Sequence, residues 1–389
     1  MKAVFDRQAL LGAIVPAAGI SQTKNTFAAV DGLLFECPPD PKYGNYDTDK
    51  DNLCRISAFD LEKGLRTSVE CTVLERGMAV INTVKILQIV RALPDGEITI
   101  EVNQRGLAVI TGGSFRFEIT ASPGNDFPAM PMFVGDRVYR IPQTVLKNVI
   151  AKTLYAVAQN DPRAAFNGAL FRIRDGRLSV VGSDGFRIAI AETGLEEGNG
   201  LPEGEIIIPG KFLGELLRLL NDSEEEITMM LTRKHVVFQL DRIYFFTRIM
   251  DTEYVPYEQF LPSAAKTEAV VSREDFLSAM ESASVVTEDK PGGTKSIVRL
   301  VFSETGIALS SVSSGGSVSG TVPAKVDGEE ITIAFQCRML AEALKATPES
   351  CRDLRIQLNS PKMGVTVAPA EQSGTKLLHF VLPWLLNNG

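Results

Sequence analysis

The chain has 389 residues, of which 44% are hydrophobic and 23% charged, a balance that is typical of folded rather than disordered proteins. The formal net charge of −8 excludes a protein that holds nucleic acid by overall attraction, so any phosphate contact must be local. No run approaches the roughly 18 apolar residues of a membrane span, and the N-terminus MKAVFDRQ lacks the apolar core of a signal peptide, so we expect a cytoplasmic protein.

The cysteines and histidines do not form a recognisable metal or disulfide pattern. The cysteines are odd in number and include no CxxC pair, and they are Cys37, Cys54, Cys71, Cys337 and Cys351. The two histidines, His235 and His379, lie in strand-like sequence and are more typical of strand positions than of ligands. We therefore expect free thiols, no metal site and no cofactor.

The first third of the chain opens with a capped amphipathic helix, FDRQALLGAI from Phe5, and a strand from Gly32. Residues 36–55 then form a run rich in Pro, Asp, Gly and Tyr, about 12 residues longer than the corresponding part of the next repeat. We interpret it as a surface loop or longer hairpin, and a tolerated insertion is favoured over a binding role. A helix, turn and strand over residues 85–102 and two hairpin strands complete this third.

The second third repeats this order. The helix IPQTVLKNVI begins at Ile141 with an N1 proline, and a strand follows from Gly168. The segment KFLGELLRLLNDSEEEITMML, residues 211–231, then predicts a helix, an acidic turn and a strand. One helix face carries leucines, namely Leu213, Leu216, Leu217 and Leu220. Lys211 and Arg218, seven residues apart, lie on the opposite face, so the helix has an apolar and a basic side.

The last third carries the same elements again. VSREDFLSAM from Val271 predicts the first helix, VRLV from Val298 the following strand, and residues 338–358 the second helix, turn and strand. Arg338 and Lys345 are again seven residues apart and opposite apolar side chains.

The spacing of these segments predicts three similar domains. The second-helix segments start 126 and 127 residues apart, and the first-helix segments 136 and 130 apart. Each repeat has two helices and about eight mostly antiparallel strands, so the fold class is α+β. The expected domains are residues 1–128, 129–258 and 259–389, joined by Pro- and Gly-rich segments that begin at Asp126 and Tyr254.

Catalytic motifs are not apparent. The adjacent Glu225 and Glu226 lie in a turn without a companion base, no histidine lies in a loop where a triad needs one, and PGGTKS from Pro291 lacks the Gly that precedes Lys in a phosphate-binding loop. An enzyme is therefore the least favoured class.

Several segments, in order and over essentially the whole chain, resemble the bacterial beta sliding clamp family, the beta subunit of DNA polymerase III. They are IPQTVLKNVI, DPRAAFNGALF, VGSDGFRIAIAET, IIIPGKFLGELLRLL, SFRFEITASPGNDFP and VLPWLL. The resemblance implies a ring-shaped head-to-tail homodimer, with helices lining the hole, that encircles duplex DNA without sequence preference. Its implied partners are the polymerase III catalytic subunit, the clamp loader and other proteins with a clamp-binding motif.

The resemblance also implies three sets of site residues. The DNA-facing residues would be Lys24, Lys85, Arg91, Lys147, Lys152, Lys211, Arg218, Arg338 and Lys345. The pocket for partner peptides would be Phe166, Ser183, Gly185, Phe186, Arg187, Ile188, Val255, Phe260, Phe380, Leu382, Pro383, Trp384, Leu385 and Leu386. The dimer interface would include Phe117 and Ile119 on one side and Val285 and Val286 on the other.

Each set has a plainer alternative. Lysines often cover solvated helix faces, Arg187 fits a structural ion pair, and the interface residues fit ordinary core packing. The acidic first helix of the third repeat, with Glu274, Asp275 and Glu281, makes its part in a DNA-facing wall doubtful.

The C-terminus departs from the family, whose members commonly finish with Met-Pro-Met-Arg-Leu. Here Trp384 and Leu385 replace part of that pattern and Asn387-Asn388-Gly389 follow, which predicts an altered peptide preference. The alternative function is a protein-binding scaffold that keeps the clamp fold without a DNA role.

Overall fold

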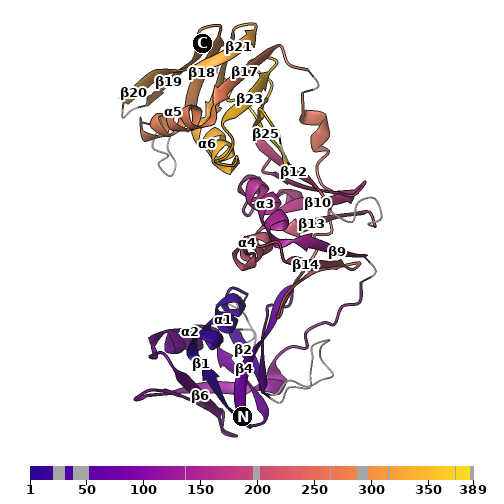
Figure 1. The fold of residues 1–389 in the computed structure, drawn as a ribbon, viewed down its shortest axis with the longest axis vertical. Coiled ribbons are helices and arrows are strands. Elements are labelled where there is room, and N and C mark those ends of the chain that lie inside the picture. Colours follow the sequence, from indigo (N-terminus) through magenta and orange to yellow (C-terminus); the bar gives the residue numbers. More distant parts are fainter. Residues whose placement is uncertain are drawn as a thin grey trace. The chain divides into compact units, whose positions relative to one another are not determined.

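The computed structural model describes residues 1–20, 31–37, 52–135, 137–195, 202–262, 264–286, 297–313, 316–372 and 374–385. The chain divides into two compact units, one made of Met1–Gln143 and Ser223–Ile249 and the other of Thr144–Asp222 and Met250–Gly389. Over the described residues it forms six α-helices and 25 strands, and every strand pairing that the sheets record is antiparallel (Figure 1). The predicted α+β class is confirmed. Among the same residues, no helix combines the length and the apolarity needed to cross a bilayer.

The six helices confirm the predicted repeat. The first helices of the repeats are α1 (Arg7–Ala18), α3 (Gln143–Thr153) and α5 (Arg273–Val286). The second helices are α2 (Thr83–Ala92), α4 (Gly210–Leu219) and α6 (Cys337–Ala346), which begin 127 residues apart in both intervals. Each second helix is followed by a strand, as the sequence predicts.

Unit 1 contains one 12-stranded sheet. Its strands are β1 (Lys2–Asp6), β2 (Gly32–Cys37), β3 (Leu53–Phe59), β4 (Lys63–Glu75), β5 (Gly77–Asn82), β6 (Glu97–Val102), β7 (Leu107–Gly112), β8 (Phe115–Pro123), β9 (Arg137–Pro142), β14 (Glu226–Leu231), β15 (His235–Leu240) and β16 (Ile243–Arg248). The order is β1-β6-β7-β8-β5-β2-β3-β4-β16-β15-β14-β9, and β1 also pairs with β4, which closes the first eight strands on themselves. Four strands of the second repeat thus extend the sheet of the first.

Unit 2 contains a nine-stranded and a four-stranded sheet. The larger has the order β13-β10-β11-β12-β25-β24-β23-β17-β21, and the smaller β20-β19-β18-β22. Their strands are β10 (Gly168–Arg174), β11 (Arg177–Ser183), β12 (Arg187–Gly194), β13 (Gly204–Pro209), β17 (Thr267–Ser272), β18 (Ile297–Ser303), β19 (Gly306–Ser313), β20 (Gly316–Val322), β21 (Ala324–Gly328), β22 (Ile331–Gln336), β23 (Asp353–Leu358), β24 (Val365–Pro369) and β25 (Lys376–Val381). The β12–β25 pairing joins strands of the second and third repeats, and the docking cavity described below lies at one end of it.

The amphipathic pattern of α4 is largely confirmed. Leu213, Leu216 and Leu220 are buried, Leu217 is half-buried, and the predicted basic residues on the other face are exposed. Burial of three leucines stabilises the helix against its sheet by roughly 1.5–3 kcal/mol per side chain. The helix is therefore held by packing, and its cations face away from the core.

An arginine at the start of two first helices ties together the two helices of its repeat. The Arg7 guanidinium on α1 donates to the Arg91 carbonyl in the last turn of α2, at 2.9 Å. The Arg273 guanidinium on α5 donates to the Thr347 carbonyl at the end of α6, at 3.1 Å. A cation at a helix C-terminus satisfies carbonyls that have no intrahelical partner.

Candidate functional site

A cavity of about 180 Å³ in unit 2 brings together most of the predicted docking residues. Its lining is Arg163, Phe166, Ser183, Gly185, Phe186, Arg187, Ile188, Val255, Phe260, Phe380 and Leu382. Ten of these eleven residues are in the predicted pocket set. Most of the wall is apolar, with a few polar groups at one side, which is the usual character of a site that binds an apolar anchor.

The turn between β11 and β12 shapes one side of this cavity. Gly185 has a φ of 86°, in the left-handed region that favours glycine. A Cβ at this position would also lie 2.9 Å from the Arg163 guanidinium. Asp184 accepts hydrogen bonds from the backbone N–H groups of Phe186 and Arg187, which closes the turn. The next residue, Ile188, pairs with Phe380 of β25, so two walls of the cavity share one register.

Arg163 lines the cavity although the sequence analysis did not assign it there. Its guanidinium lies 4.2 Å from the centre of the Phe166 ring and forms an ion pair with Asp161 at 2.9 Å. The Asp161 carboxylate raises the pKa of the Arg163 guanidinium, chiefly through their hydrogen bond. Arg163 stands in DPRAAF, part of one of the segments that carry the family resemblance. This position was the signal in the sequence that could have assigned Arg163 to the cavity.

Arg187 is both a cavity residue and a structural ion-pair residue. Its side chain is only 10% exposed and forms ion pairs with Asp184, at 3.0 Å, and with Glu342 of α6. It also donates to the backbone carbonyl of Tyr155, at 2.8 Å. The ion-pair interpretation therefore describes this residue, and the ion pairs hold its guanidinium in the cavity wall, while its role in peptide binding stays a prediction.

The segment that supplies Val255 and Phe260 is held by polar contacts. A 3₁₀ turn covers Tyr257–Phe260. Arg172 of β10 donates to Glu258 at 2.8 Å in this turn, and the Tyr254 hydroxyl donates to the Val181 carbonyl at 3.1 Å. The predicted linker is thus packed against unit 2 on its described part.

The residues after Leu382 lie beyond the cavity lining. The backbone N–H of Leu382 donates to the Phe186 carbonyl at 2.9 Å, and that of Trp384 donates to the Ala334 carbonyl of β22 at 2.7 Å. Pro383, Trp384 and Leu385 therefore do not contribute to the cavity wall. Leu386 and the Asn387-Asn388-Gly389 end lie outside the described residues.

The predicted DNA-facing cations that the structure describes lie on helices, and most of them are exposed. Lys85 and Arg91 are exposed on α2, and Lys211, Arg218, Arg338 and Lys345 are exposed on α4 and α6. Lys147 and Lys152 of α3 are half-buried, and Lys24 lies outside the described residues. Three cations have acidic neighbours: Lys147 pairs with Asp222, Arg338 with Glu342, and Lys345 with Glu281.

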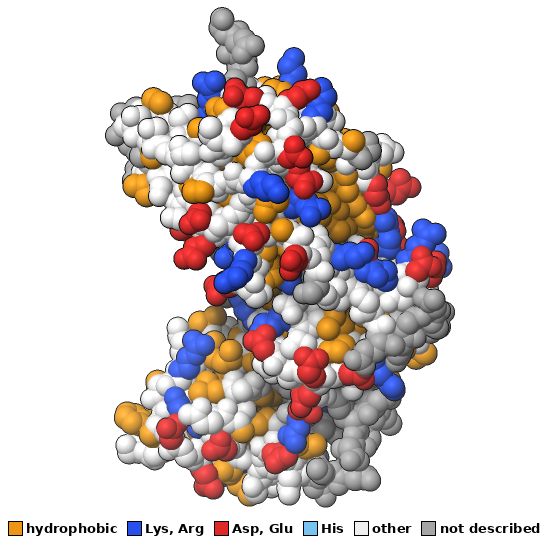
Figure 2. Space-filling model, turned by 45° about the horizontal axis from the view of Figure 1, so that its top comes forward, with side chains coloured by type: hydrophobic (Ala, Val, Ile, Leu, Met, Phe, Trp, Pro, Cys, Tyr) orange, Lys and Arg blue, Asp and Glu red, His pale blue; other side chains and the backbone are white. Residues whose placement is uncertain are grey.

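These ion pairs bear on the strength of any phosphate contact. Glu281 belongs to α5, the acidic helix, and its carboxylate offsets one of the two α6 cations. Figure 2 shows Lys and Arg side chains interspersed with Asp and Glu over the visible face. A surface of this kind attracts phosphates weakly, and because surface ion pairs exchange easily, a passing phosphate can replace a carboxylate.

The four predicted interface residues lie on one strand of unit 1 and one helix of unit 2. Phe117 and Ile119 are half-buried on β8, where Phe117 pairs with Ile110 of β7. Val285 is 78% exposed near the end of α5, the helix whose last residue is Val286. Val285 is therefore not part of the core, and ordinary core packing does not account for it.

The part of the chain that the structure describes contains no group of three or more His, Cys, Asp or Glu side chains that could hold a metal ion. His379 is fully buried between the hydroxyls of Tyr155 and Thr347, at 2.7 and 3.3 Å, and is closed off from any substrate. His235 packs on Phe133, with ring centres 4.7 Å apart.

Comparison with known proteins gives one consistent family. Models of the DNA polymerase III beta subunit match in chain order: the N-terminal domain over residues 1–131, the central domain over 140–256 and the C-terminal domain over 258–383. The beta sliding clamp of Halalkalibacterium halodurans is 30% identical over 303 residues, 77% of this chain and 78% of that protein. The Bacillus subtilis beta sliding clamp is 27% identical over 352 residues, covering 89% and 90%. The crystal structure of the Bacillus subtilis clamp superposes with a TM-score of 0.90 at 22% identity, over 99% of both chains.

The repeated α+β fold and the apolar docking cavity define a clamp-type binding subunit rather than an enzyme. The extent of the matches makes the assignment specific. The chain belongs to the family of the bacterial DNA polymerase III beta subunit, the beta sliding clamp. It is a DNA polymerase processivity factor without a catalytic role of its own.

Proposed function

We propose that two copies of the chain close head to tail into a cytoplasmic ring whose helices face duplex DNA. The exposed cations of α2, α4 and α6 support this orientation, because they lie opposite the buried apolar faces of their helices. The net charge of −8 and the ion-paired lysines favour weak, sequence-independent contacts. Retention then comes from enclosure, which lets the ring slide. The domains of this arrangement are residues 1–128, 129–258 and 259–389.

The ring proposal is tested by retention on DNA of different topology. We expect loaded protein to stay on nicked circular DNA and to leave the same DNA within seconds after it is made linear, because no tight contact holds it in place. Gel filtration of the protein–DNA mixture before and after cutting measures this. Equal loss from both forms would contradict encirclement, and equal retention on both would favour tight binding instead.

We propose further that the 180 Å³ cavity docks partner proteins through a short peptide with apolar anchors. The observation that carries this proposal is the convergence of Phe166, Ile188, Phe260 and Phe380 on one opening, with Arg163 and Arg187 at its side. Such walls suit one or two apolar side chains of a peptide, and the two guanidiniums suit its polar or acidic flanking groups.

Phe260→Ala should weaken binding of a clamp-binding peptide by roughly 10- to 100-fold, since a lining aromatic residue typically contributes about 1–3 kcal/mol to an interface. Phe260 is 55% exposed in the free protein, so its removal should leave folding intact. Fluorescence anisotropy with a labelled peptide provides the measurement. Met363→Ala, at a 43% exposed position outside the cavity, is the control.

Trp384→Ala addresses the altered C-terminus in the same assay. Because the C-terminus departs from the family pattern at Trp384, we expect Trp384→Ala to weaken peptide binding more than the Met363→Ala control does. Because Trp384 lies beyond the cavity lining, we expect this loss to be smaller than that of Phe260→Ala. A Trp384→Ala affinity equal to the control would reject the predicted role of this residue in peptide preference.

A further inference from the structure

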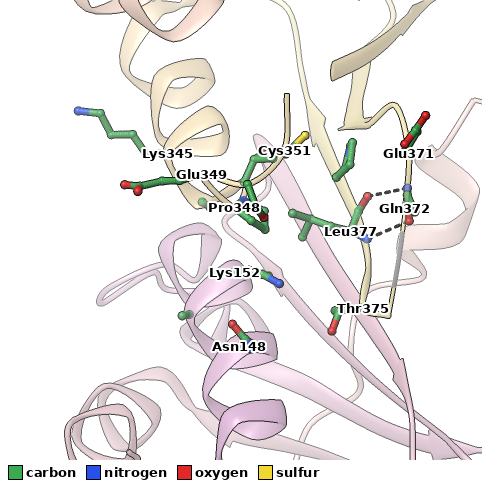
Figure 3. A pocket seen from close by; sticks show the side chains of 15 residues that line it. Asn148, Lys152, Lys345, Pro348, Glu349, Cys351, Glu371, Gln372, Thr375 and Leu377 are labelled. Atoms are coloured by element: carbon green, nitrogen blue, oxygen red, sulfur yellow. Dashed lines mark hydrogen bonds between the residues drawn. The ribbon is translucent and has the colours of Figure 1, made fainter. Parts of the chain in front are cut away.

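A second and larger cavity in unit 2 has no part in the docking site. It has a volume of about 640 Å³ and lies between α3, the loop that follows α6, and the turn between β24 and β25. Figure 3 shows Lys152 and Asn148 entering it from α3, Pro348 and Cys351 from the loop, and Leu377 from β25. Its lining shares no residue with the docking cavity.

Lys152 is the unusual group in this cavity. Its side chain is half-buried, yet within the described parts of the chain its ammonium has no ion-pair or hydrogen-bond partner. Burial lowers the pKa of Lys152, because the charged form loses hydration. Lys345, which also lines the cavity, is by contrast paired with Glu281 at 3.0 Å. A partly desolvated cation without a partner is stabilised by any anion that reaches it.

The polar groups around Lys152 divide into engaged and available ones. The Gln372 amide is occupied on both atoms by the backbone of Leu377, as the dashed lines of Figure 3 show. The Thr347 hydroxyl is occupied by the Ala343 carbonyl and His379. Asn148 stands one helical turn before Lys152, on the same face of α3, so its amide can donate to a group bound by the lysine.

The carboxylates at the cavity limit the charge of a ligand. Glu349 and Glu371 are both lining residues, and in Figure 3 their carboxylates point away from Lys152. They leave room for one anionic group at the lysine but would repel a second or third. Pro348 and Leu377 lie next to Lys152 in the same view and offer apolar contact.

We propose that this cavity binds a nucleoside monophosphate unit, with its phosphate on Lys152 and Asn148 and its sugar or base against Pro348 and Leu377. The cavity is large enough for a nucleotide and far larger than a lone phosphate needs. The unit can be a free nucleotide or an unpaired nucleotide of a DNA strand. The second source rests on the proposed position of α3 beside DNA, whereas the first does not.

Isothermal titration of the full-length protein with deoxyadenosine monophosphate, deoxyadenosine triphosphate and a single-stranded pentanucleotide tests the proposal. The variants are Lys152→Gln, Lys152→Arg and, as the control for a surface lysine, Lys362→Gln. We expect Lys152→Gln to weaken monophosphate binding by about tenfold, since it removes a charge-assisted hydrogen bond. Lys152→Arg should restore it to within about threefold, and Lys362→Gln should match the unchanged protein.

The outcomes separate the sources and the alternatives. If the pentanucleotide binds more tightly than the monophosphate, and Lys152→Gln weakens both to the same extent, the cavity binds DNA. If the monophosphate binds more tightly and shows this loss, the cavity binds a free nucleotide. Preference for the triphosphate, or equal binding by Lys152→Gln and the unchanged protein, overturns the proposal. Unchanged thermal stability of Lys152→Gln is the check on folding. Retention on nicked circular DNA is measured in parallel, so a failed ring and an unoccupied cavity give different results.

Discussion

A protein that carries both Val285→Asp and Val286→Asp should run as a monomer at concentrations where the unchanged protein is a dimer. Val285 is 78% exposed at the end of α5, so an aspartate there is fully hydrated in the monomer. If the proposed interface covers it, the carboxylate loses that hydration on assembly. A buried, unpaired charge typically costs several kcal/mol, so dimer affinity should fall by at least about 1,000-fold.

The geometry of a head-to-tail dimer increases this effect. Two identical interfaces close such a ring, so each double substitution acts twice. Val134→Asp is the matched control, because Val134 is 96% exposed in unit 1 and is outside the proposed interface. Light scattering gives the mass directly, and the monomer should also lose retention on nicked circular DNA. A dimer mass unchanged by the double substitution would refute the assignment of α5 to the interface.

The helices could be predicted from the sequence because their determinants are local. In α4, the spacing of Leu213, Leu216 and Leu220 defines the buried face without reference to the rest of the chain. The starts of α1, α3 and α5 follow from a capping residue or a proline before each amphipathic run. Repetition at nearly even spacing then supplies the number of repeats.

The way the strands combine could not be predicted in this manner. Strand β16 of the second repeat pairs with β4 of the first, with Phe245 opposite Leu65. Strand β12 of the second repeat pairs with β25 of the third, with Ile188 opposite Phe380. These pairings join residues 180 and 192 positions apart, and hydrophobic alternation defines a strand but not its distant neighbour. One sheet therefore runs from the first repeat into the second, which the repeat spacing does not indicate.

Most of the cavity lining was predicted from family motifs, and the differences have physical causes. Arg163 was missed because its segment indicates the family but not which side chain lines the cavity, and its position depends on the stacking over Phe166. Trp384 was included because it continues the motif of Leu382, but the hydrogen bond of its backbone to Ala334 directs the chain past the cavity. That Lys152 has no ion-pair partner among the described residues could not be predicted, because this appears only once its neighbours are placed.

Lowering the pH from 7.5 to 5 should destabilise unit 2 through His379. Burial, with a smaller contribution from the nearby Arg187 and Lys152 cations, lowers the pKa of this histidine to about 3. In the unfolded chain its pKa is about 6.5. Between these two values the unfolded chain binds a proton that the folded state excludes, so the stability from His379 is complete above pH 6.5 and declines as the pH falls toward 3.

The size of the effect follows from the linkage relation. At pH 5 the unfolded state gains about 2 kcal/mol from protonating this one residue. The His379→Gln variant keeps an amide that can reach the hydroxyls of Tyr155 and Thr347 but cannot take up the proton. We therefore expect the variant to be less stable than the unchanged protein at pH 7.5, and this difference to shrink by about 2 kcal/mol at pH 5.

Trp384 is the only tryptophan of the chain and stands three residues after β25, the strand that carries His379. Its fluorescence during urea unfolding thus reports on unit 2. Carboxylates that titrate over the same pH range are present in both the His379→Gln variant and the unchanged protein, so their effect on stability cancels in the comparison. His235→Gln, in unit 1, serves as the control, since burial also lowers the pKa of His235 but the residue lies in the other unit. If the difference in stability between the His379→Gln variant and the unchanged protein is the same at pH 7.5 and pH 5, the folded state accepts the proton. His379 is then not held neutral by its surroundings.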